Sequence, residues 1–430
     1  MKIEYDQYKL TNGLNVILHQ DDRVPIVAVN VWYDVGSKNE RPGKTGFAHL
    51  FEHMMFQGSA HVPADLHFKL IQRVGGTLNG STFFDRTNYY ETLPSHYLEM
   101  GLWLEADRMG FLLPALDQAK LDNQLDVVKN ERRQRVDNQP YGRWLEKILE
   151  MAFEPDFPYH WPVIGYMEDL DRVTLDDVRE FFRTYYAPNN ASLVVAGDFD
   201  PAETRELIEK YFADIPAGAV PPAVERKFRA YNQGEKRTVL KDRVQLPRLY
   251  MAYHFPEFGT PDAYVTDVIS DILSSGRSSR LYQSLVYRQQ IAQDAQAVFL
   301  PLKLTSLLII MVTPRPEVPI EKIEQALQRE LDDLRNQFVD PDELQRVKNQ
   351  IEARKIREFQ SVASRADQLN MHAVYFNRAE GINDEIEQYR KITIENVYET
   401  AGIYLNDNNR VVVTFVPVDG EDQTPQEVSG

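Results

Sequence analysis

Residues 49–53 of the sequence, His-Leu-Phe-Glu-His, place three side chains that can bind a metal ion or transfer a proton within five positions. On a helix, positions i and i+4 lie on one face and position i+3 lies beside them, so His49, Glu52 and His53 converge. Two imidazoles can hold a zinc ion that keeps an open coordination position, and a neighbouring glutamate can act there as a general base. The spacing therefore predicts a metal-dependent catalytic helix.

The alternative interpretation is a half-buried helix whose polar residues simply face water. The chain has no cysteine, so a transition metal would have to bind imidazole and carboxylate groups. The other histidines form no comparable cluster in the sequence, and each is expected to be an ordinary surface or core residue: His19, His61, His67, His96, His160, His254 and His372. The clustering in one place favours the metal site.

Strand and helix patterns surround this stretch. β-Branched runs predict strands at residues 14–19, 26–33, 192–197 and 305–313. Helical periodicity predicts helices at residues 44–57, 64–74, 95–109, 117–136, 174–186, 262–274 and 340–366. Strands come first and helix clusters follow, which indicates the α+β class, with a sheet packed by helices in each layered domain.

The two halves of the chain follow one plan. VTLDDVREFFRTYYAPNNASLVV begins at Val173 and ITIENVYETAGIYLNDNNRVVVT begins at Ile392, and their Thr, Tyr and Asn-Asn residues match at one constant offset. In each copy a threonine N-cap opens a helix, and an asparagine-rich turn and a β-branched strand follow. We therefore predict an internal duplication into homologous domains at residues 1–217 and 237–430, joined by a linker at residues 218–236.

The composition excludes some classes of partner. The 430 residues carry a net charge of −17, which would repel phosphates, so neither nucleic acid nor an anionic membrane is expected to bind. The sequence contains no apolar run of about 18 residues or more that would span a bilayer. The first residues do not form a signal-peptide pattern, which predicts a cytoplasmic location, or a periplasmic one if a signal was removed.

The inverted zinc motif His-x-x-Glu-His makes the chain similar to the pitrilysin (inverzincin) metallopeptidase family. Further blocks resemble this family in the same order: GGTLNGSTFFDRTNYYETLP (75–94), WLEADRM (103–109), PVIGYMEDL (162–170), YYAPNNASLVVAGDFDP (185–201) and GRSSRLYQSL (276–285). They span nearly the whole chain. Length and duplication resemble the half-size members, such as processing-peptidase subunits, which pair two chains around a chamber. The resemblance implies a zinc-dependent endopeptidase that cleaves peptides or unfolded segments there.

The resemblance also implies a third metal ligand. Zn2+ would be held by His49, His53 and Glu131, the last from the helix predicted at residues 117–136, and Glu52 would be the catalytic base. Gln124 stands where family members commonly carry an acidic residue that supports the metal site. A neutral amide can still form hydrogen bonds at that position, but it cannot contribute charge.

A second implied element is a strand for the substrate. Asn79, Gly80, Ser81 and Thr82 resemble the family's edge strand, to which the substrate backbone adds as a further strand. Gly80 would allow that backbone to approach closely, and Asn79 would form a hydrogen bond with it. From these four residues alone, a glycine-rich turn without any ligand fits equally well.

The second half departs from the family pattern. Its positions that match the zinc motif hold Asp267, Ser270 and Asp271, so it is expected to bind no catalytic zinc. Family enzymes also use an arginine and a tyrosine of this half to hold the substrate over the zinc. Val286 and Gln293 stand at those positions, and neither can supply a positive charge or a phenolic proton.

The missing pair predicts a partner. We expect a heterodimer in which a paralogous subunit supplies the arginine and the tyrosine, with a homodimer as the alternative. Main-chain pairing implies loose specificity, and the charge of −17 favours basic peptides as substrates. A rival function is a non-catalytic scaffold or core subunit of a larger complex, because the family includes such proteins. They typically have broken zinc motifs, whereas His49, Glu52, His53 and Glu131 are all present here.

Overall fold

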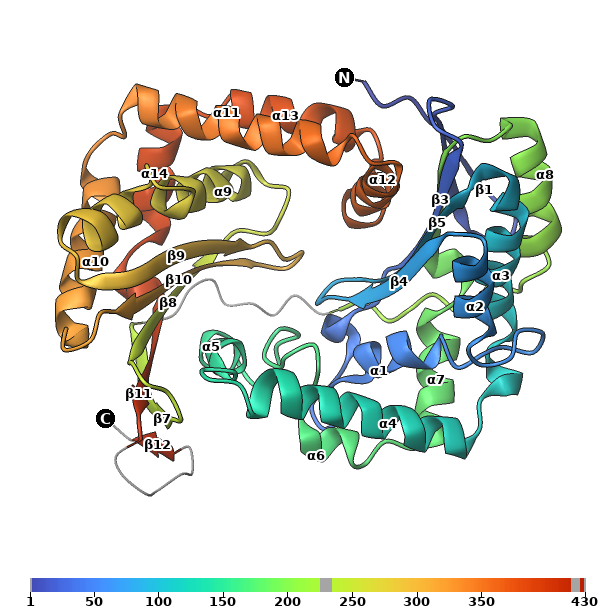
Figure 1. The fold of residues 1–430 in the computed structure, drawn as a ribbon, viewed down its shortest axis with the longest axis horizontal. Coiled ribbons are helices and arrows are strands. Elements are labelled where there is room, and N and C mark those ends of the chain that lie inside the picture. Colours follow the sequence, from blue (N-terminus) through green and yellow to red (C-terminus); the bar gives the residue numbers. More distant parts are fainter. Residues whose placement is uncertain (1, 225–233, 419–425, 429–430) are drawn as a thin grey trace. The chain divides into compact units, whose positions relative to one another are not determined.

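The structure is a computed structural model that describes residues 2–224, 234–418 and 426–428. The described residues form two compact units, each built on a six-stranded sheet packed with helices (Figure 1). The predicted α+β class is therefore confirmed. Residues 225–233 of the predicted linker lie outside the described residues.

The sheet of the first unit has the strand order β1-β2-β6-β3-β5-β4. Only the β2–β6 pair is parallel; the other neighbours are antiparallel. β4 has a described neighbour on one side only, which makes it an edge strand. The strands are β1 (Asp6–Lys9), β2 (Asn15–Gln20), β3 (Ile26–Tyr33), β4 (Thr77–Thr82), β5 (Thr87–Pro94) and β6 (Ala191–Gly197).

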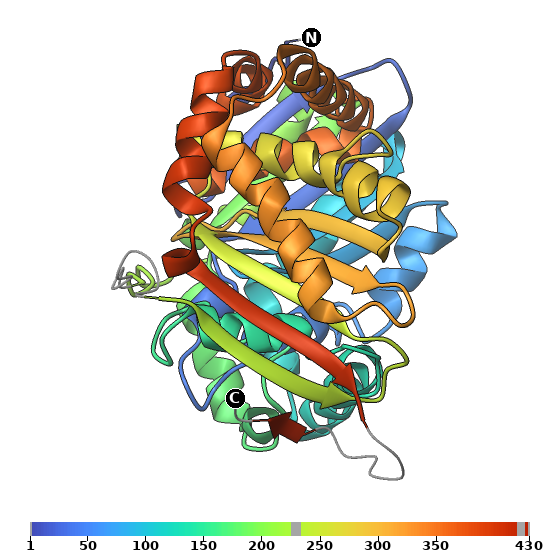
Figure 2. The ribbon, with the colours of Figure 1, turned by 90° about the vertical axis from the view of Figure 1, so that its left-hand side faces the viewer.

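The sheet of the second unit repeats this pattern in the order β12-β7-β11-β8-β10-β9. Again one pair is parallel, β7 with β11, and Figure 2 shows β11 in red between β7 and β8. The matching order and directions confirm the internal duplication. The strands are β7 (Lys236–Asp242), β8 (Arg248–Phe255), β9 (Ala292–Leu300), β10 (Ser306–Pro314), β11 (Arg410–Pro417) and β12 (Gln426–Val428).

Helices cover the sheets, and capping residues fix several of their ends. Thr174 and Thr393 each form a capping box at the start of matching helices, α7 and α14. The helices are α1 (Phe47–Met54), α2 (Leu66–Arg73), α3 (Leu98–Phe111), α4 (Gln118–Arg132), α5 (Trp144–Ala152), α6 (Met167–Leu170), α7 (Leu175–Tyr185), α8 (Pro201–Phe212), α9 (Pro261–Ser274), α10 (Ile320–Asn336), α11 (Pro341–Glu358), α12 (Val362–Phe376), α13 (Gly381–Arg390) and α14 (Ile394–Tyr404).

The two compact units differ from the two halves of the sequence in two segments. Within the described residues, Arg133–His160 belongs to the second unit and Lys355–Asp384 belongs to the first. α5 packs on β8 and β11, where Trp144 stacks on Tyr250 with ring centroids 5.2 Å apart. α12 packs on β3 and β6, where the indole N–H of Trp32 donates to Asp367 over 2.9 Å. Each half thus contributes one helix to the other half's sheet.

The helix predicted at residues 340–366 is two helices. α11 ends at Glu358, and α12 begins at Val362 after the N-cap Ser361, whose hydroxyl accepts from the N–H of Ser364. A serine that satisfies a free N–H at a helix start favours a break there. The separation allows α12 to lie on the sheet of the first unit.

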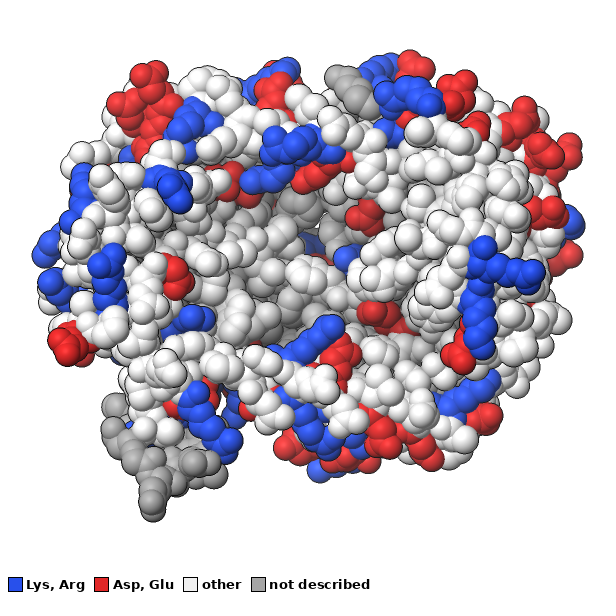
Figure 3. All heavy atoms as spheres, in the orientation of Figure 1, with Lys and Arg blue, Asp and Glu red and all other residues white. Residues whose placement is uncertain are grey.

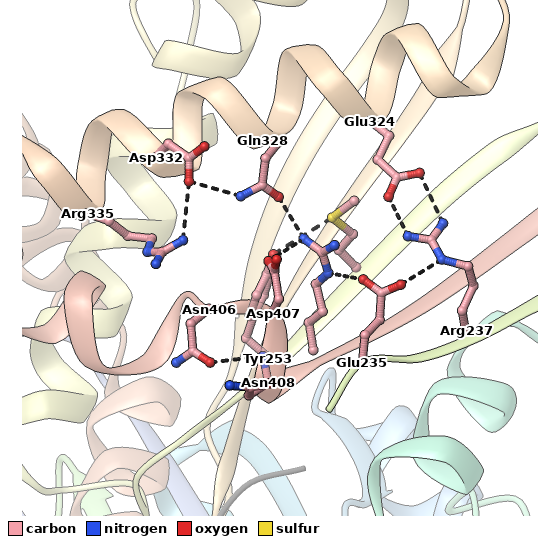
Figure 4. Close-up of polar contacts among 12 residues, drawn as sticks. Glu235, Arg237, Tyr253, Glu324, Gln328, Asp332, Arg335, Asn406, Asp407 and Asn408 are labelled. Carbon is pink, nitrogen blue, oxygen red and sulfur yellow. Dashed lines mark hydrogen bonds and ion pairs between the residues drawn. The ribbon is translucent and has the colours of Figure 1, made fainter. Parts of the chain in front are cut away.

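A network of charged side chains joins α10 to the strands of the second unit (Figure 4). Arg237 on β7 donates to Glu235 over 2.8 Å and to Glu324 on α10 over 3.0 Å. Arg410 on β11 also binds Glu235 and donates to Gln328 on α10 over 2.6 Å. Partly exposed ion pairs contribute little singly, but shared partners let these side chains hold α10 in one position.

The charged residues are mixed on the surface. On the face drawn in Figure 3, acidic and basic side chains are interspersed, so the excess negative charge does not gather in one patch there. Among the helices that the structure describes, none combines the length and the apolar character needed to cross a bilayer.

Candidate metal and catalytic site

The first unit places the predicted motif on α1, beside β4 and α4 (Figure 1). One face of α1 packs into the hydrophobic core of this unit through Phe47, Leu50, Phe51 and Met54. On the other face the side chains of His49 and His53 are 12% and 22% exposed. The helix therefore presents both imidazoles at the surface while its apolar face anchors it.

The third predicted ligand lies against these imidazoles. Oε2 of Glu131, near the end of α4, is 3.6 Å from Nε2 of His49 and 3.3 Å from Nε2 of His53. One ligand atom from each of the three residues lies within 4.8 Å of the others. Zinc bonds of roughly 2.0–2.2 Å in a tetrahedral site put neighbouring ligand atoms about 3.4 Å apart. The donor set and its spacing therefore fit a zinc ion with an open position.

Glu52 lies on the same helix in a more enclosed environment. The hydroxyl of Thr82, at the end of β4, donates to Glu52 Oε2 over 2.7 Å. Burial raises the pKa of Glu52, and the hydrogen bond from Thr82 and the nearby His53 oppose this rise. A carboxylate with a raised pKa is a stronger base than an exposed one. The sequence predicts Thr82 to be a substrate-binding residue, whereas the structure shows it in contact with Glu52.

β4 runs beside Glu52 as an edge strand. A Cβ on Gly80 would lie 3.2 Å from Cγ of Glu52, so glycine lets the backbone of β4 approach α1 closely. Asn79 is exposed, and its Oδ1 accepts from the N–H of Gly80 over 2.9 Å. Ser81 donates to Asn88 on β5 over 2.7 Å. Binding of a substrate backbone to residues 79–82 stays a prediction.

Gln124 lies two turns before Glu131 on α4 and is buried, with 6% of its surface exposed. Its side-chain amide donates to Oδ1 of Asn123 over 2.8 Å. The supporting role proposed for Gln124 at the metal site stays a prediction.

Glu40 is a site residue that the sequence did not reveal. Its two carboxylate oxygens accept from the N–H groups of Gly46 and Ala48 over 2.9 and 2.8 Å. These N–H groups lie at the start of α1, where backbone donors have no partner within the helix. A carboxylate there also interacts favourably with the helix dipole. An acidic residue shortly before a helix start was the available signal.

The second unit presents different chemistry on α9. Arg354 of α11 forms ion pairs with Asp271 over 3.1 Å and Asp267 over 3.4 Å. Val286 is half-buried against the core of this unit, in the π-helical turn Tyr282–Arg288. Gln293 is exposed on β9. These are the side chains that stand in place of the zinc motif and of the Arg/Tyr pair.

A second cluster of possible metal ligands, His67, Glu91 and Glu105, is buried in the first unit. Nε2 of His67 is 3.2 Å from Glu91, and the guanidinium of Arg108 donates to Glu105 over 2.9 Å. Burial raises the pKa of Glu91 to about 7 and lowers the pKa of His67 to about 3. Because a guanidinium already supplies the positive charge, this cluster is a buried ionic group rather than a zinc site.

Two family models match the chain. The one described as "Insulinase (Peptidase family M16)" matches residues 15–158, and the one described as "Peptidase M16 inactive domain" matches residues 172–351. The first therefore contains the residues of the candidate site, and the second contains α9.

Several relatives are similar over nearly the whole chain. "Zinc protease PqqE" of Helicobacter pylori is 30% identical, with 96% of this chain and 93% of that protein aligned. "Probable mitochondrial-processing peptidase subunit beta, mitochondrial" of Arabidopsis thaliana is 21% identical, with 95% and 78% aligned. Among solved structures, a protease from Helicobacter pylori has a TM-score of 0.91 at 28% identity, covering 97% of this chain and all 100% of that one.

Proposed function

Since the chain belongs to peptidase family M16, we propose that it is a zinc-dependent endopeptidase subunit that hydrolyses peptides or unfolded segments. The observation that carries this proposal is the convergence of His49, His53 and Glu131 within 4.8 Å beside Glu52. Relatives that are named zinc proteases support zinc as the metal.

Zinc held by these three residues would supply a Lewis acid for the peptide carbonyl and for the attacking water. Glu52 would take a proton from the attacking water, because burial makes its carboxylate a better base. The hydrogen bond from Thr82 holds the carboxylate in one orientation during this transfer. Glu52 then returns the proton to the amine that leaves.

The substrate backbone is proposed to pair with the outer edge of β4. An added strand gains main-chain hydrogen bonds from an edge, whatever its side chains are. Gly80 keeps this edge close to Glu52, so the pairing would bring a peptide bond towards the base. Selection would then depend on an extended, unfolded segment rather than on one sequence.

A paralogous subunit is proposed to complete the enzyme. Val286 and Gln293 carry neither the charge nor the phenolic proton expected at their positions. The heterodimer would pair two chains around an enclosed chamber, and the partner would contribute the arginine and the tyrosine. A homodimer that uses another residue is the alternative, and a cytoplasmic location stays a prediction.

The test is zinc content together with cleavage of an unfolded peptide, measured for the chain alone and with a paralogue from the same genome. We expect one zinc per chain, slow cleavage alone and fast cleavage in the mixture. Equal rates in both samples would exclude the heterodimer. Bound zinc without cleavage in either sample would support the scaffold function, and absence of zinc would refute the site itself.

A further inference from the structure

The proposed zinc site joins two helices that are distant in the sequence. His49 and His53 lie on α1, whereas Glu131 lies on α4. Metal–ligand distances tolerate errors of only about 0.2 Å, so something must fix the position of α4 relative to α1. The segment of residues 162–170, Pro-Val-Ile-Gly-Tyr-Met-Glu-Asp-Leu, contacts both helices and has no role in the mechanism above.

This segment crosses the start of α1 at two glycines. Gly46 and Gly165 have φ values of +85° and +74°, which favour glycine. A Cβ on Gly165 would lie 2.5 Å from the Cα and N of Gly46, and one on Gly46 would lie 2.8 Å from the carbonyl oxygen of Ile164. Contacts this close leave no room for any side chain at either position. Glycine at both positions therefore allows the two backbones to approach each other this closely.

Hydrogen bonds also join the two backbones where they cross. Both the N–H and the hydroxyl of Thr45 donate to Oδ2 of Asp169, over 3.0 and 2.7 Å. The N–H of Tyr166 in turn donates to the hydroxyl of Thr45 over 2.9 Å. Thr45 and Asp169 are buried, at 1% and 7% exposure, so these bonds are protected from water. They tie the residue before Gly46 to the segment.

The same segment also holds α4, through Gly165 itself and through Asp171, the residue that follows the segment. Nη1 of Arg132, the residue next to Glu131, donates to the carbonyl oxygen of Gly165 over 2.7 Å. Arg132 is 5% exposed, and Lys129, one turn earlier, pairs with Asp171 over 2.5 Å. Gly165 thus contacts α1 through its backbone and α4 through its carbonyl.

We propose that residues 162–170 act as a bracket that sets the distance between the two imidazoles and Glu131. Arg132 and Thr45 are positioning residues: neither contacts the metal, but each fixes one helix to the bracket. The inference rests on the proposed zinc function. It predicts that loosening either attachment weakens zinc binding more than it weakens the fold.

The main test replaces Arg132 by methionine and measures three properties of the full chain. These are the affinity for Zn2+ in a chelator competition, the visible absorption of the Co2+ form, and the thermal unfolding of the metal-free protein. We expect zinc affinity to fall by about 10–100-fold, as is typical when a residue that supports a ligand is lost. The Co2+ absorption should also change, because it reports the ligand geometry.

The matched control is Arg365→Met. Arg365 is also buried in the first unit and also donates from Nη1 to a backbone carbonyl, that of Phe359, over 2.7 Å. It lies on α12, which packs on β3 and β6, and its Nη2 also pairs with Asp21. This variant should lower the unfolding temperature while it keeps the zinc affinity and the Co2+ spectrum of the unchanged chain.

A milder variant, Thr45→Val, keeps the shape but removes the hydroxyl, so it tests the other attachment if Arg132→Met does not fold. It too should weaken zinc binding. An unchanged zinc affinity and Co2+ spectrum in the folded variants would overturn the bracket, and so would an equal loss of affinity in Arg365→Met. If the unchanged chain itself binds no Zn2+, the proposed function fails instead.

Discussion

In each unit an equivalent helix packs on equivalent strands of the sheet, but the polar side chains on the two helices differ. α1 packs on β4 and β5, and α9 packs on the matching strands β9 and β10. On α1 the side chains of His49 and His53 converge with Glu131 from α4. On α9 two carboxylates bind the guanidinium of Arg354 from α11. In the first unit the positive charge would come from a bound zinc ion. In the second unit it comes from the side chain of Arg354.

This difference shows that the packing of the helix does not depend on metal-binding side chains. Asp267, Asp271 and Arg354 satisfy one another, so α9 and α11 are joined without a ligand. A guanidinium has no open coordination position and lowers no water pKa, so the second unit keeps the scaffold without the catalytic potential. A duplicated fold can therefore keep the packing of a helix on a sheet while the side chains on that helix differ.

The most severe test gives the first unit the side chains of the second. We expect the double substitution His49→Asp/His53→Asp to abolish zinc binding and all measurable cleavage, because aspartate is too short to reach the position of the imidazole Nε2 atoms. Zinc per chain after dialysis and circular dichroism measure binding and folding. A folded double variant that retains one zinc would contradict the assignment of these ligands.

Glu52→Gln removes the proposed base and leaves the three proposed metal ligands unchanged. A neutral amide cannot take a proton, so we expect the cleavage rate to fall by about 10²- to 10⁴-fold. Zinc content should stay at one per chain, because Glu52 is not among the converging ligands. A Glu52→Gln variant that cleaves peptides at a near-normal rate would show that another group is the base. The matched Ser270→Ala change on α9 should affect neither property.

Arg354→Met tests the charge balance of the second unit. It leaves Asp267 and Asp271 without their cation, and we expect unfolding to become easier by about 1–2 kcal/mol in a urea titration. This is less than the roughly 3–5 kcal/mol for breaking a fully buried pair, since 39% of the Arg354 side chain is exposed.

Two further measurements check the reason for this loss. Burial already raises the pKa of Asp271, and Arg354 opposes the rise, so the variant should lose more stability at neutral than at acidic pH. Adding Asp267→Asn and Asp271→Asn to the Arg354→Met variant should restore part of the lost stability. An Arg354→Met variant as stable as the unchanged chain would mean that the ion pairs contribute nothing to stability. Zinc binding should be unchanged in all of these variants.

Substitutions in the buried pair His67 and Glu91 should have the smallest effect, a change in how stability depends on pH. Burial keeps a proton on Glu91 up to a pKa of about 7 instead of 4.5, and keeps His67 neutral down to a pKa of about 3 instead of 6.5. Between pH 4.5 and 6.5 these two shifts give the folded and unfolded states equal numbers of protons, so their effects on stability cancel.

Glu91→Gln should remove this balance. The neutral His67 then makes the folded state bind fewer protons, so the free energy of unfolding should fall by about 1 kcal/mol between pH 7 and pH 5.5. The melting temperature at the two pH values measures it. His67→Gln is the opposite control, with stability that decreases as pH rises from 4.5 to 7. Identical pH profiles in all three proteins would refute the cancellation.

Local patterns predicted most of the secondary structure around the site. The start and end of β3 match the prediction, and α1, α4 and α9 lie within a few residues of their predicted ranges. The break between α11 and α12 was missed, because continuous helical periodicity does not show that Ser361 caps a new helix. The exchange of α5 and α12 between the two halves of the sequence was also missed, because an apolar helix face does not specify which sheet it will cover.

The sequence by itself determined that His49, Glu52 and His53 share one region of a helix, because 3.6 residues per turn fixes their relation whatever surrounds them. It also carried the duplication, since matching strands and caps need only local propensities. Tertiary packing decided that Glu131 meets the imidazoles, that Thr82 contacts Glu52 and that Arg354 binds α9. These contacts join segments far apart in the chain, so no local sequence pattern specifies them, even where a residue such as Gly80 permits the close approach of β4 to Glu52.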